Sequence, residues 1–502
     1  MRCAALSLAV VLGLGCYQVV GPVDRDAGDD AGDDAPGDAP CVGSPCDPRN
    51  CGACGVSCGE GEVCAAGVCR APAPTVRWVR SFRGTGGSAA ALAFDRSGEL
   101  YVAGNAFGDV DLGTGALRGS ARGAPVLARY DRFGGARWAR DFAAAGSDAS
   151  GFTSASLGPD ATLWTAGTFA YQVNVGGETL RAGSLLGGLF AAYDASGAHR
   201  FSLSITSPPA PRGSSPDNRF VAAAATPDGD GIVAGYYEAN AVLGGRTYNN
   251  GRFGGIVARY GPRGEARWVR TLLGSAALTL RDVKVDASGD IVVAGVFAGS
   301  AELGTRMESH GTYDAFVARL DARGEPRWAV ALGGPGEDVA ERLALGPDGT
   351  AYVTGATQGG FRAGALLTAG RGFLVAVDAD GTPRWVRSYV NYAASNPDAS
   401  THGVAVNRAG HVLVTGSWRG SLIVEGRTLR SAVRSGFVAA YSAAGDPLWS
   451  RDFAGFDLLP YAVATDACGS IAVGGTFGGT VPLGAATLAT GAHEAFVAMW
   501  DE

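Results

Sequence analysis

Cysteine offers the widest choice of chemistry in this 502-residue chain, and seven cysteines fall within 29 residues: Cys41, Cys46, Cys51, Cys54, Cys58, Cys64 and Cys69. A C-x-x-C pair such as Cys51 and Cys54 could in isolation be a redox pair or half of a zinc site. However, no histidine precedes His199, and a glycine-rich module of this size cannot fold on a hydrophobic core of its own. We therefore expect disulfides among these seven and Cys468, with Cys468 bonded to Cys69. The alternative is a free, buried Cys468 that acts as a small apolar residue, with one thiol left unpaired in the module.

Histidine chemistry is not expected. The five histidines fall in different copies of a sequence repeat and at different positions within it, so neither a metal site nor a histidine-based triad is predicted: His199, His310, His402, His411 and His493. Asp-x-x-Gly segments such as Asp321 to Gly324 lack the alternating oxygen ligands of a calcium loop and are interpreted as Asx-type turns. We predict no cofactor, no metal and no catalytic residue.

The repeat sets the positions of these residues. Six tryptophans and one phenylalanine open the same short strand in successive copies, spaced 60, 63, 67, 60, 57 and 64 residues apart: Trp78, Trp138, Phe201, Trp268, Trp328, Trp385 and Trp449. In each copy the first turn has two glycines six residues apart, as in Gly289 and Gly295, with Ala161 replacing the first glycine in one copy. Constant turn lengths with fixed glycines indicate tight hairpins between antiparallel strands.

A repeat of this length indicates a solenoid, an array or a propeller. We predict an all-β fold, a seven-bladed β-propeller of four-stranded antiparallel blades over residues 75–502, because radial repetition leaves only short, protected edges. The repeats begin with a fourth strand, at residues 75–82, and end with a third strand. The N-terminal strand is therefore expected to close the ring as the outer strand of the blade built from residues 461–502.

Several segments resemble known families. The phrase from Asp314 to Trp328, followed by Gly333-Gly334-Pro335-Gly336-Glu337-Asp338, resembles the β-propeller repeats of bacterial cell-surface proteins, which implies an extracytoplasmic propeller without a catalytic set. Residues 41–70 resemble the cysteine module of stigma-specific proteins, which implies a disulfide-rich module. The spacing of Asp321, Gly324 and Trp328 is similar to the tryptophan-docking repeat of quinoprotein dehydrogenases, but the Thr-Gly pair of that motif is missing.

The N-terminus is expected to direct export. Residues 1–15 have a charged start and a short apolar core, too short to span a membrane, as in a signal peptide. Leu14-Gly15-Cys16 resembles a bacterial lipoprotein signal, which implies lipidation at Cys16; an ordinary secretory signal is the alternative. Residues 16–40, with seven aspartates and one arginine from position 17 on, are expected to form a disordered tether. The protein is therefore predicted at the outer membrane or cell surface, held by the lipid anchor only.

Function is expected on the face of the propeller that carries loops of variable length, the longest at 206–218 and 390–402. Equivalent positions beside the central channel give a candidate ligand face: Arg281, Asp282, Glu341, Arg342, His402 and Tyr461. The alternative is that these residues form a solvated or mutually paired rim. The net charge of −7 at pH 7 gives no case for nucleic acid.

Two functions remain open. We favour a monomeric, non-enzymatic surface lipoprotein that binds a polysaccharide, peptide or protein. The alternative is a propeller enzyme, a quinoprotein dehydrogenase or a polysaccharide lyase or hydrolase. Paired carboxylates or a basic-aromatic cluster converging on the channel would favour the enzyme.

Overall fold

The computed structural model describes residues 63–65, 68–70, 75–84, 86–142, 147–208, 217–391, 398–424, 427–483, 486–491 and 493–501. The chain divides into two compact units, Met1–Pro72 and Ala73–Glu502. The predicted signal peptide, Cys16, the tether and most of the cysteine module lie outside the described residues, as do the middles of the two long loops. In the first unit, β1 (Val63–Ala65) pairs antiparallel with β2 (Val68–Arg70), which sets the backbone of Cys64 opposite that of Cys69.

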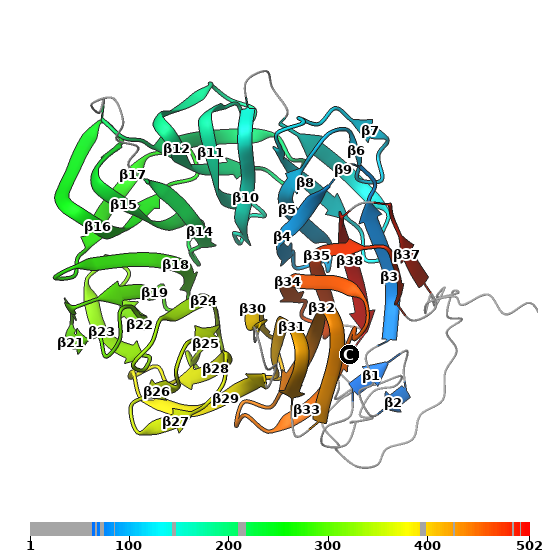
Figure 1. Cartoon of the computed structure of the whole chain (residues 1–502). Coiled ribbons are helices and arrows are strands. Elements are labelled where there is room, and N and C mark those ends of the chain that lie inside the picture. Colours follow the sequence, from blue (N-terminus) through cyan, green and yellow to red (C-terminus); the bar gives the residue numbers. More distant parts are fainter. Residues whose placement is uncertain are drawn as a thin grey trace, which may run out of the picture. The chain divides into compact units, whose positions relative to one another are not determined.

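The second unit is built from antiparallel strands around a central opening (Figure 1). One repeat gives β18 (Ala277–Val285), β19 (Ile291–Ala298), β22 (Asp314–Leu320) and β23 (Pro326–Leu332), hydrogen-bonded in that order. All seven residues of β22 are buried, because the strand has neighbours on both edges and packed sheets on both faces. The outer strand β23 is less buried, with only Ala329 and Leu332 fully buried, as expected for an edge.

Four sheets of this unit have four strands each. They are β4 (Gly87–Phe94), β5 (Leu100–Ala106), β8 (Ala124–Tyr130) and β9 (Ala136–Asp141); β10 (Ser147–Leu157), β11 (Leu163–Val173), β12 (Leu180–Tyr193) and β13 (His199–Ile205); β14 (Arg219–Ala225), β15 (Gly231–Leu243), β16 (Arg246–Tyr260) and β17 (Ala266–Leu272); and β34 (Asp457–Thr465), β35 (Ser470–Gly478), β38 (Glu494–Asp501) and β3 (Thr75–Phe82). Three small hairpins extend from the ring: β6 (Val110–Asp111) with β7 (Ala116–Leu117), β20 (Ser300–Leu303) with β21 (Thr305–Glu308), and β36 (Thr480–Leu483) with β37 (Ala486–Ala489).

The prediction of a seven-bladed propeller with separate four-stranded blades is wrong for the described residues. Two further sheets have six and eight strands. β23 pairs with the small hairpin β26 (Phe361–Ala363) and β27 (Leu366–Thr368) through Leu332 and Ala363. β29 pairs with β31 because β29 runs on past the position where the outer strands of other repeats, such as Pro326–Leu332, stop. This pairing joins two repeats into one sheet: β24 (Asp338–Leu345), β25 (Ala351–Thr357), β28 (Gly372–Val377), β29 (Pro383–Asn391), β30 (Asp398–Val406), β31 (Val412–Val424), β32 (Arg427–Tyr441) and β33 (Pro447–Asp452).

An all-β propeller is nevertheless the architecture, and its ring is closed. The strands nearest the centre contact one another in chain order, and the last contacts the first: β4, β10, β14, β18, β24, β30 and β34. The predicted closure is confirmed, since β3 pairs antiparallel with β38 and becomes the outer strand of the last sheet. The described residues contain no helix long and apolar enough to cross a membrane.

The two glycines of the first turn have separate roles. Gly289 takes a positive φ of 88°, the left-handed conformation that the tight turn requires. Gly295 lies opposite a bulge in β18, where a Cβ would come within 2.0 Å of the carbonyl oxygen of Thr279. Ala161, which replaces a turn glycine, takes the same left-handed conformation, with φ 60°.

The repeated aromatic residue joins each repeat to the next. The Nε1 atoms of four tryptophans donate to backbone carbonyls in the second turn of the following repeat, at 2.9 to 3.1 Å: Trp78 to Arg132, Trp138 to Ala195, Trp328 to Ala379 and Trp385 to Ala443. The rings lie over the glycines of those turns, where a Cβ would meet them at 2.7 to 3.0 Å. Packing between repeats therefore accounts for the repeated tryptophan.

Candidate functional site

One end of the ring, which we call the turn face, carries the first turns of the repeats. Asp286 Oδ1 accepts hydrogen bonds from the backbone nitrogens of Ser288 at 2.9 Å and Asp290 at 3.0 Å. Asp95 makes the same two bonds in its own turn, so the interpretation of these segments as Asx-type turns is confirmed. Hydrogen bonds to Ser288, Asp290 and Arg319 outweigh the effect of burial and lower the pKa of Asp286.

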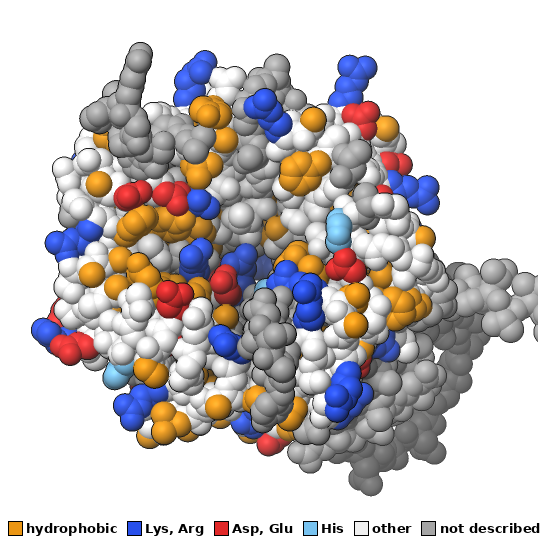
Figure 2. Space-filling model, viewed as in Figure 1, with side chains coloured by type: hydrophobic (Ala, Val, Ile, Leu, Met, Phe, Trp, Pro, Cys, Tyr) orange, Lys and Arg blue, Asp and Glu red, His pale blue; other side chains and the backbone are white. Residues whose placement is uncertain are grey.

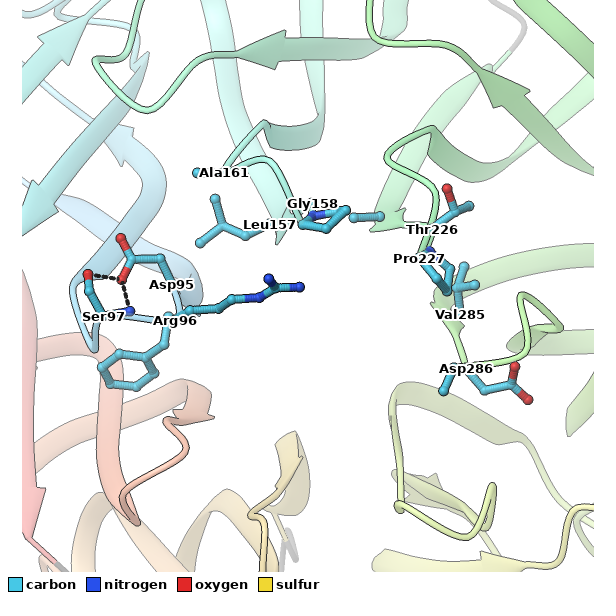
Figure 3. A pocket seen from close by; sticks show the side chains of 14 residues that line it. Asp95, Arg96, Ser97, Leu157, Gly158, Ala161, Thr226, Pro227, Val285 and Asp286 are labelled. Carbon is cyan, nitrogen blue, oxygen red and sulfur yellow. Dashed lines mark hydrogen bonds between the residues drawn. The ribbon is translucent and has the colours of Figure 1, made fainter. Parts of the chain in front are cut away.

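Two adjoining cavities open at the centre of the turn face, with volumes of about 550 and 540 Å³. They share Val285, Asp286 and Ala287. Figure 3 shows the larger cavity, into which the turns after β4, β10, β14 and β18 project. Arg96 lines this cavity, and Arg408 lines the adjoining one. Neither cavity was predicted, because turns of fixed length were expected to have only a structural role.

Four of the predicted ligand-face residues occupy equivalent places on successive inner strands, and we call them the channel-wall residues: Arg281, Glu341, His402 and Tyr461. Each lies at a register shift where its strand bulges against the next: between Leu280 and Asp282 in β18, Ala340 and Arg342 in β24, Thr401 and Val404 in β30, and Pro460 and Ala462 in β34. A bulge leaves one residue outside the ladder and redirects its side chain. Figure 2 shows one face of the ring, where basic and acidic side chains gather around a central hollow.

His402 and Tyr461 are in contact. Their rings lie 5.3 Å apart, edge to face, and His402 Nε2 is 2.9 Å from the hydroxyl oxygen of Ser417. Burial, followed in importance by the positive charges of Arg434 and Arg342, lowers the pKa of His402 from 6.5 to about 4. The imidazole is therefore neutral at pH 7 and offers a hydrogen bond rather than a charge.

The other predicted residues differ in what they do. Asp282 is only 2% exposed and accepts hydrogen bonds from the Leu343 amide at 2.9 Å and from Lys284 Nζ at 2.7 Å, so it holds two inner strands together. Arg342 donates to the carbonyl oxygen of its neighbour Glu341. The buried Nε of Arg281 has no hydrogen-bond partner among the described residues.

A further polar cluster near Arg281 was not predicted. Arg219 Nε lies 2.5 Å from Asp217 Oδ1, and the Tyr236 hydroxyl donates to Asp217 Oδ2 at 3.2 Å. Burial raises the pKa of Tyr236, and the charges of Arg219 and Arg281 oppose that rise. The sequence signal was weak, because Asp217 ends a loop of unusual length and has no counterpart in the other repeats.

The described part of the chain contains no group of three or more His, Cys, Asp or Glu side chains arranged to hold a metal ion. No protein-family model matches the sequence. The chain is 29% identical over 136 residues to the regulatory protein FlaEY of Caulobacter vibrioides, a match that covers 25% of this chain and 14% of that protein. The chain thus matches only a small part of that relative.

Solved structures with similar folds include the WD40 repeats of RRP9, with a TM-score of 0.46, 10% identity, and coverage of 86% of this chain and 99% of that one. A catalytically inactive virginiamycin B lyase from Staphylococcus aureus, solved with quinupristin, has a TM-score of 0.39, 7% identity, and coverage of 85% and 99%. Because both TM-scores are below 0.5, these likenesses carry no argument about function. The strand topology itself places this chain among the β-propeller proteins.

Proposed function

We propose that this chain is a non-enzymatic, lipid-anchored surface protein that binds a polysaccharide, peptide or protein at the channel-wall residues. The observation that carries the proposal is their placement at the bulges of four successive inner strands, β18, β24, β30 and β34. They bring a guanidinium, a carboxylate, an imidazole and a phenol together on rigid strands. Such a mixture can hydrogen-bond a polar ligand with little loss of side-chain freedom.

The electrostatic state of the site supports binding of a polar ligand. Neutral His402 can donate a hydrogen bond to such a ligand or accept one from it. Asp282 is already occupied by Leu343 and Lys284, which leaves it a supporting role in this proposal.

The test is a screen of the mature full-length protein against glycan and peptide arrays. The test variant carries Arg281→Gln and Tyr461→Phe. These substitutions remove a hydrogen-bonding group from each of two channel-wall residues and keep the approximate shape of the side chains. We expect one class of ligand to bind the native protein and to bind the double variant at least tenfold more weakly, because two hydrogen-bonding groups are lost. Equal binding by both proteins would contradict the proposed site.

Export and anchoring form a separate part of the proposal and need a separate test. Replacement of Cys16 by Ser should move the protein from the membrane fraction to the soluble fraction, because a thioether-linked lipid can no longer form. Unchanged membrane attachment of the variant would contradict lipidation at Cys16. The array result does not depend on this outcome.

A second candidate function is a polysaccharide lyase or hydrolase. The observation that favours it is the basic-aromatic cluster, in which neutral His402 contacts Tyr461 and lies in the field of Arg342 and Arg434. A neutral imidazole can accept a proton from a substrate. Release of shortened oligosaccharides by the native protein, abolished in His402→Gln, would establish this function in place of simple binding.

A further inference from the structure

The walls of the turn-face cavities are apolar. The last residue of each contributing inner strand is a half-buried apolar side chain: Phe94, Leu157, Ala225, Val285, Leu345 and Val406. A second tier of exposed turn residues surrounds them and includes Pro159, Pro227 and Ala287. An open cavity of about 550 Å³ with these walls has the size and the apolar character of a small-molecule site.

The acidic residues of the larger cavity are already paired. Asp95 accepts a hydrogen bond from the Ser97 hydroxyl at 2.6 Å and one from Arg129 at 2.8 Å. Asp286 is bonded to Ser288 and forms an ion pair with Arg319. These carboxylates are therefore held by their own turns and sheets and contribute little free negative charge to the cavity.

Arg96 is different. It is exposed, and it forms no ion pair or side-chain hydrogen bond with any other residue that the structure describes. Figure 3 shows its side chain reaching across the opening, with Pro227 and Val285 on the opposite side. The larger cavity thus combines an apolar wall with one uncompensated positive charge.

We propose that this cavity binds a small amphipathic acid, with its apolar body against Leu157 and Val285 and its carboxylate at the Arg96 guanidinium. Charge complementarity selects the anionic group, because a guanidinium pairs with a carboxylate through two parallel hydrogen bonds. The apolar wall selects the body, since burial of apolar surface is favourable wherever water is displaced. This site is separate from the channel-wall residues: Arg281 precedes Val285 by four residues, about 13 Å along an extended strand.

The proposal is tested by calorimetric titration of the mature full-length protein with octanoate and with 1-octanol, which has the same chain and no charge. Octanoate should bind about five- to tenfold more tightly than octanol, as expected for one charge-assisted pair at a partly exposed site. Arg96→Gln should reduce octanoate binding to the level of octanol and leave octanol binding unchanged. Val285→Thr, which keeps the side-chain shape, should weaken both ligands.

Arg408→Gln is the matched control, because Arg408 occupies the same turn position but lines the adjoining cavity. This variant should bind octanoate as the native protein does. No binding of octanoate, equal binding of octanoate and octanol, or an equal loss in Arg408→Gln and Arg96→Gln would each overturn the proposal. Because glycan and peptide binding is assigned to the channel-wall residues, failure here leaves the proposed function intact.

Discussion

The Nε1 atom of Trp138 donates a hydrogen bond to the carbonyl oxygen of Ala195 at 3.0 Å, and this bond crosses from one repeat to the next. Its ring lies over Gly197 in the same turn, which is why that turn has glycine four residues before the next aromatic anchor. Each repeat is thus held by its neighbour's turn as well as by its own hydrogen bonds. The stability of the ring should therefore depend strongly on this contact.

The contact can be tested at Gly197. Its φ is 77°, and an added Cβ would lie 3.0 Å from the Trp138 ring. Gly229 is the matched control, with a φ of 93° and no atom within 4 Å of an added Cβ. Gly197→Ala should lower the free energy of unfolding by about 1–3 kcal/mol more than Gly229→Ala, because only the first overpacks a ring. Equal losses in urea unfolding would contradict a structural role for the contact.

Ala161 should be a point of backbone strain. It takes a left-handed φ of 60° where the other repeats have glycine. That conformation costs an L-residue about 1–2 kcal/mol, of which part is offset by the greater flexibility of glycine in the unfolded chain. Ala161→Gly should therefore stabilise the protein by about 0.5–1 kcal/mol. Ala409→Gly, in an equivalent turn at a residue without positive φ, should be neutral or destabilising, and a loss of stability in Ala161→Gly would contradict the strain.

These two predictions indicate which parts of the fold follow from sequence. The glycine and tryptophan spacings predicted the hairpins and the packing between repeats, because each depends on residues within one repeat length. The closure by β3, which pairs residues about 420 positions apart, was predicted instead from the incomplete repeats at residues 75–82 and 461–502. The merging of sheets could not be predicted in this way. It depends on how far β29 continues toward Asn391, and the sequence of this strand is compatible with the shorter length seen in the other repeats.

The candidate site was predicted in part. Equivalence between repeats identified Arg281, Glu341, His402 and Tyr461, which the structure places at successive bulges. It could not distinguish Arg281 from Asp282, the next residue in the strand, whose side chain is buried. The turn-face cavities were missed, although a signal existed, since an apolar residue such as Val285 or Leu345 precedes the turn in most repeats.

The depressed pKa of His402 predicts a loss of stability in mild acid. Above pH 6.5 the residue is neutral in both folded and unfolded states. Between pH 6.5 and about 4 only the unfolded state takes up the proton, so the free energy of unfolding should fall by up to about 3 kcal/mol. His402→Gln should flatten this part of the pH profile, whereas His493→Gln, at an exposed position, should not. An unchanged profile in His402→Gln would contradict the burial of a neutral imidazole.

Cys468 is disulfide-bonded, and it lies in the turn between β34 and β35. We predict Cys69 as its partner, a residue whose side chain lies outside the described part of the structure. Peptide mapping under non-reducing conditions should yield a linked pair of peptides that contain Cys69 and Cys468. Because the backbones of Cys64 and Cys69 are paired across β1 and β2, a Cys64–Cys69 peptide is the outcome that would exclude this pairing. A Cys468 peptide alkylated as a free thiol would also exclude it.

Binding at the channel-wall residues is the central claim, and it is tested most directly by measuring the affinity of the best array ligand for three proteins. These are the native mature chain, the Arg281→Gln and Tyr461→Phe double variant, and Arg96→Gln. We predict at least tenfold weaker binding by the double variant at an unchanged melting temperature, and native affinity in Arg96→Gln. Native affinity in the double variant, or no ligand for the native chain on either array, would contradict the account.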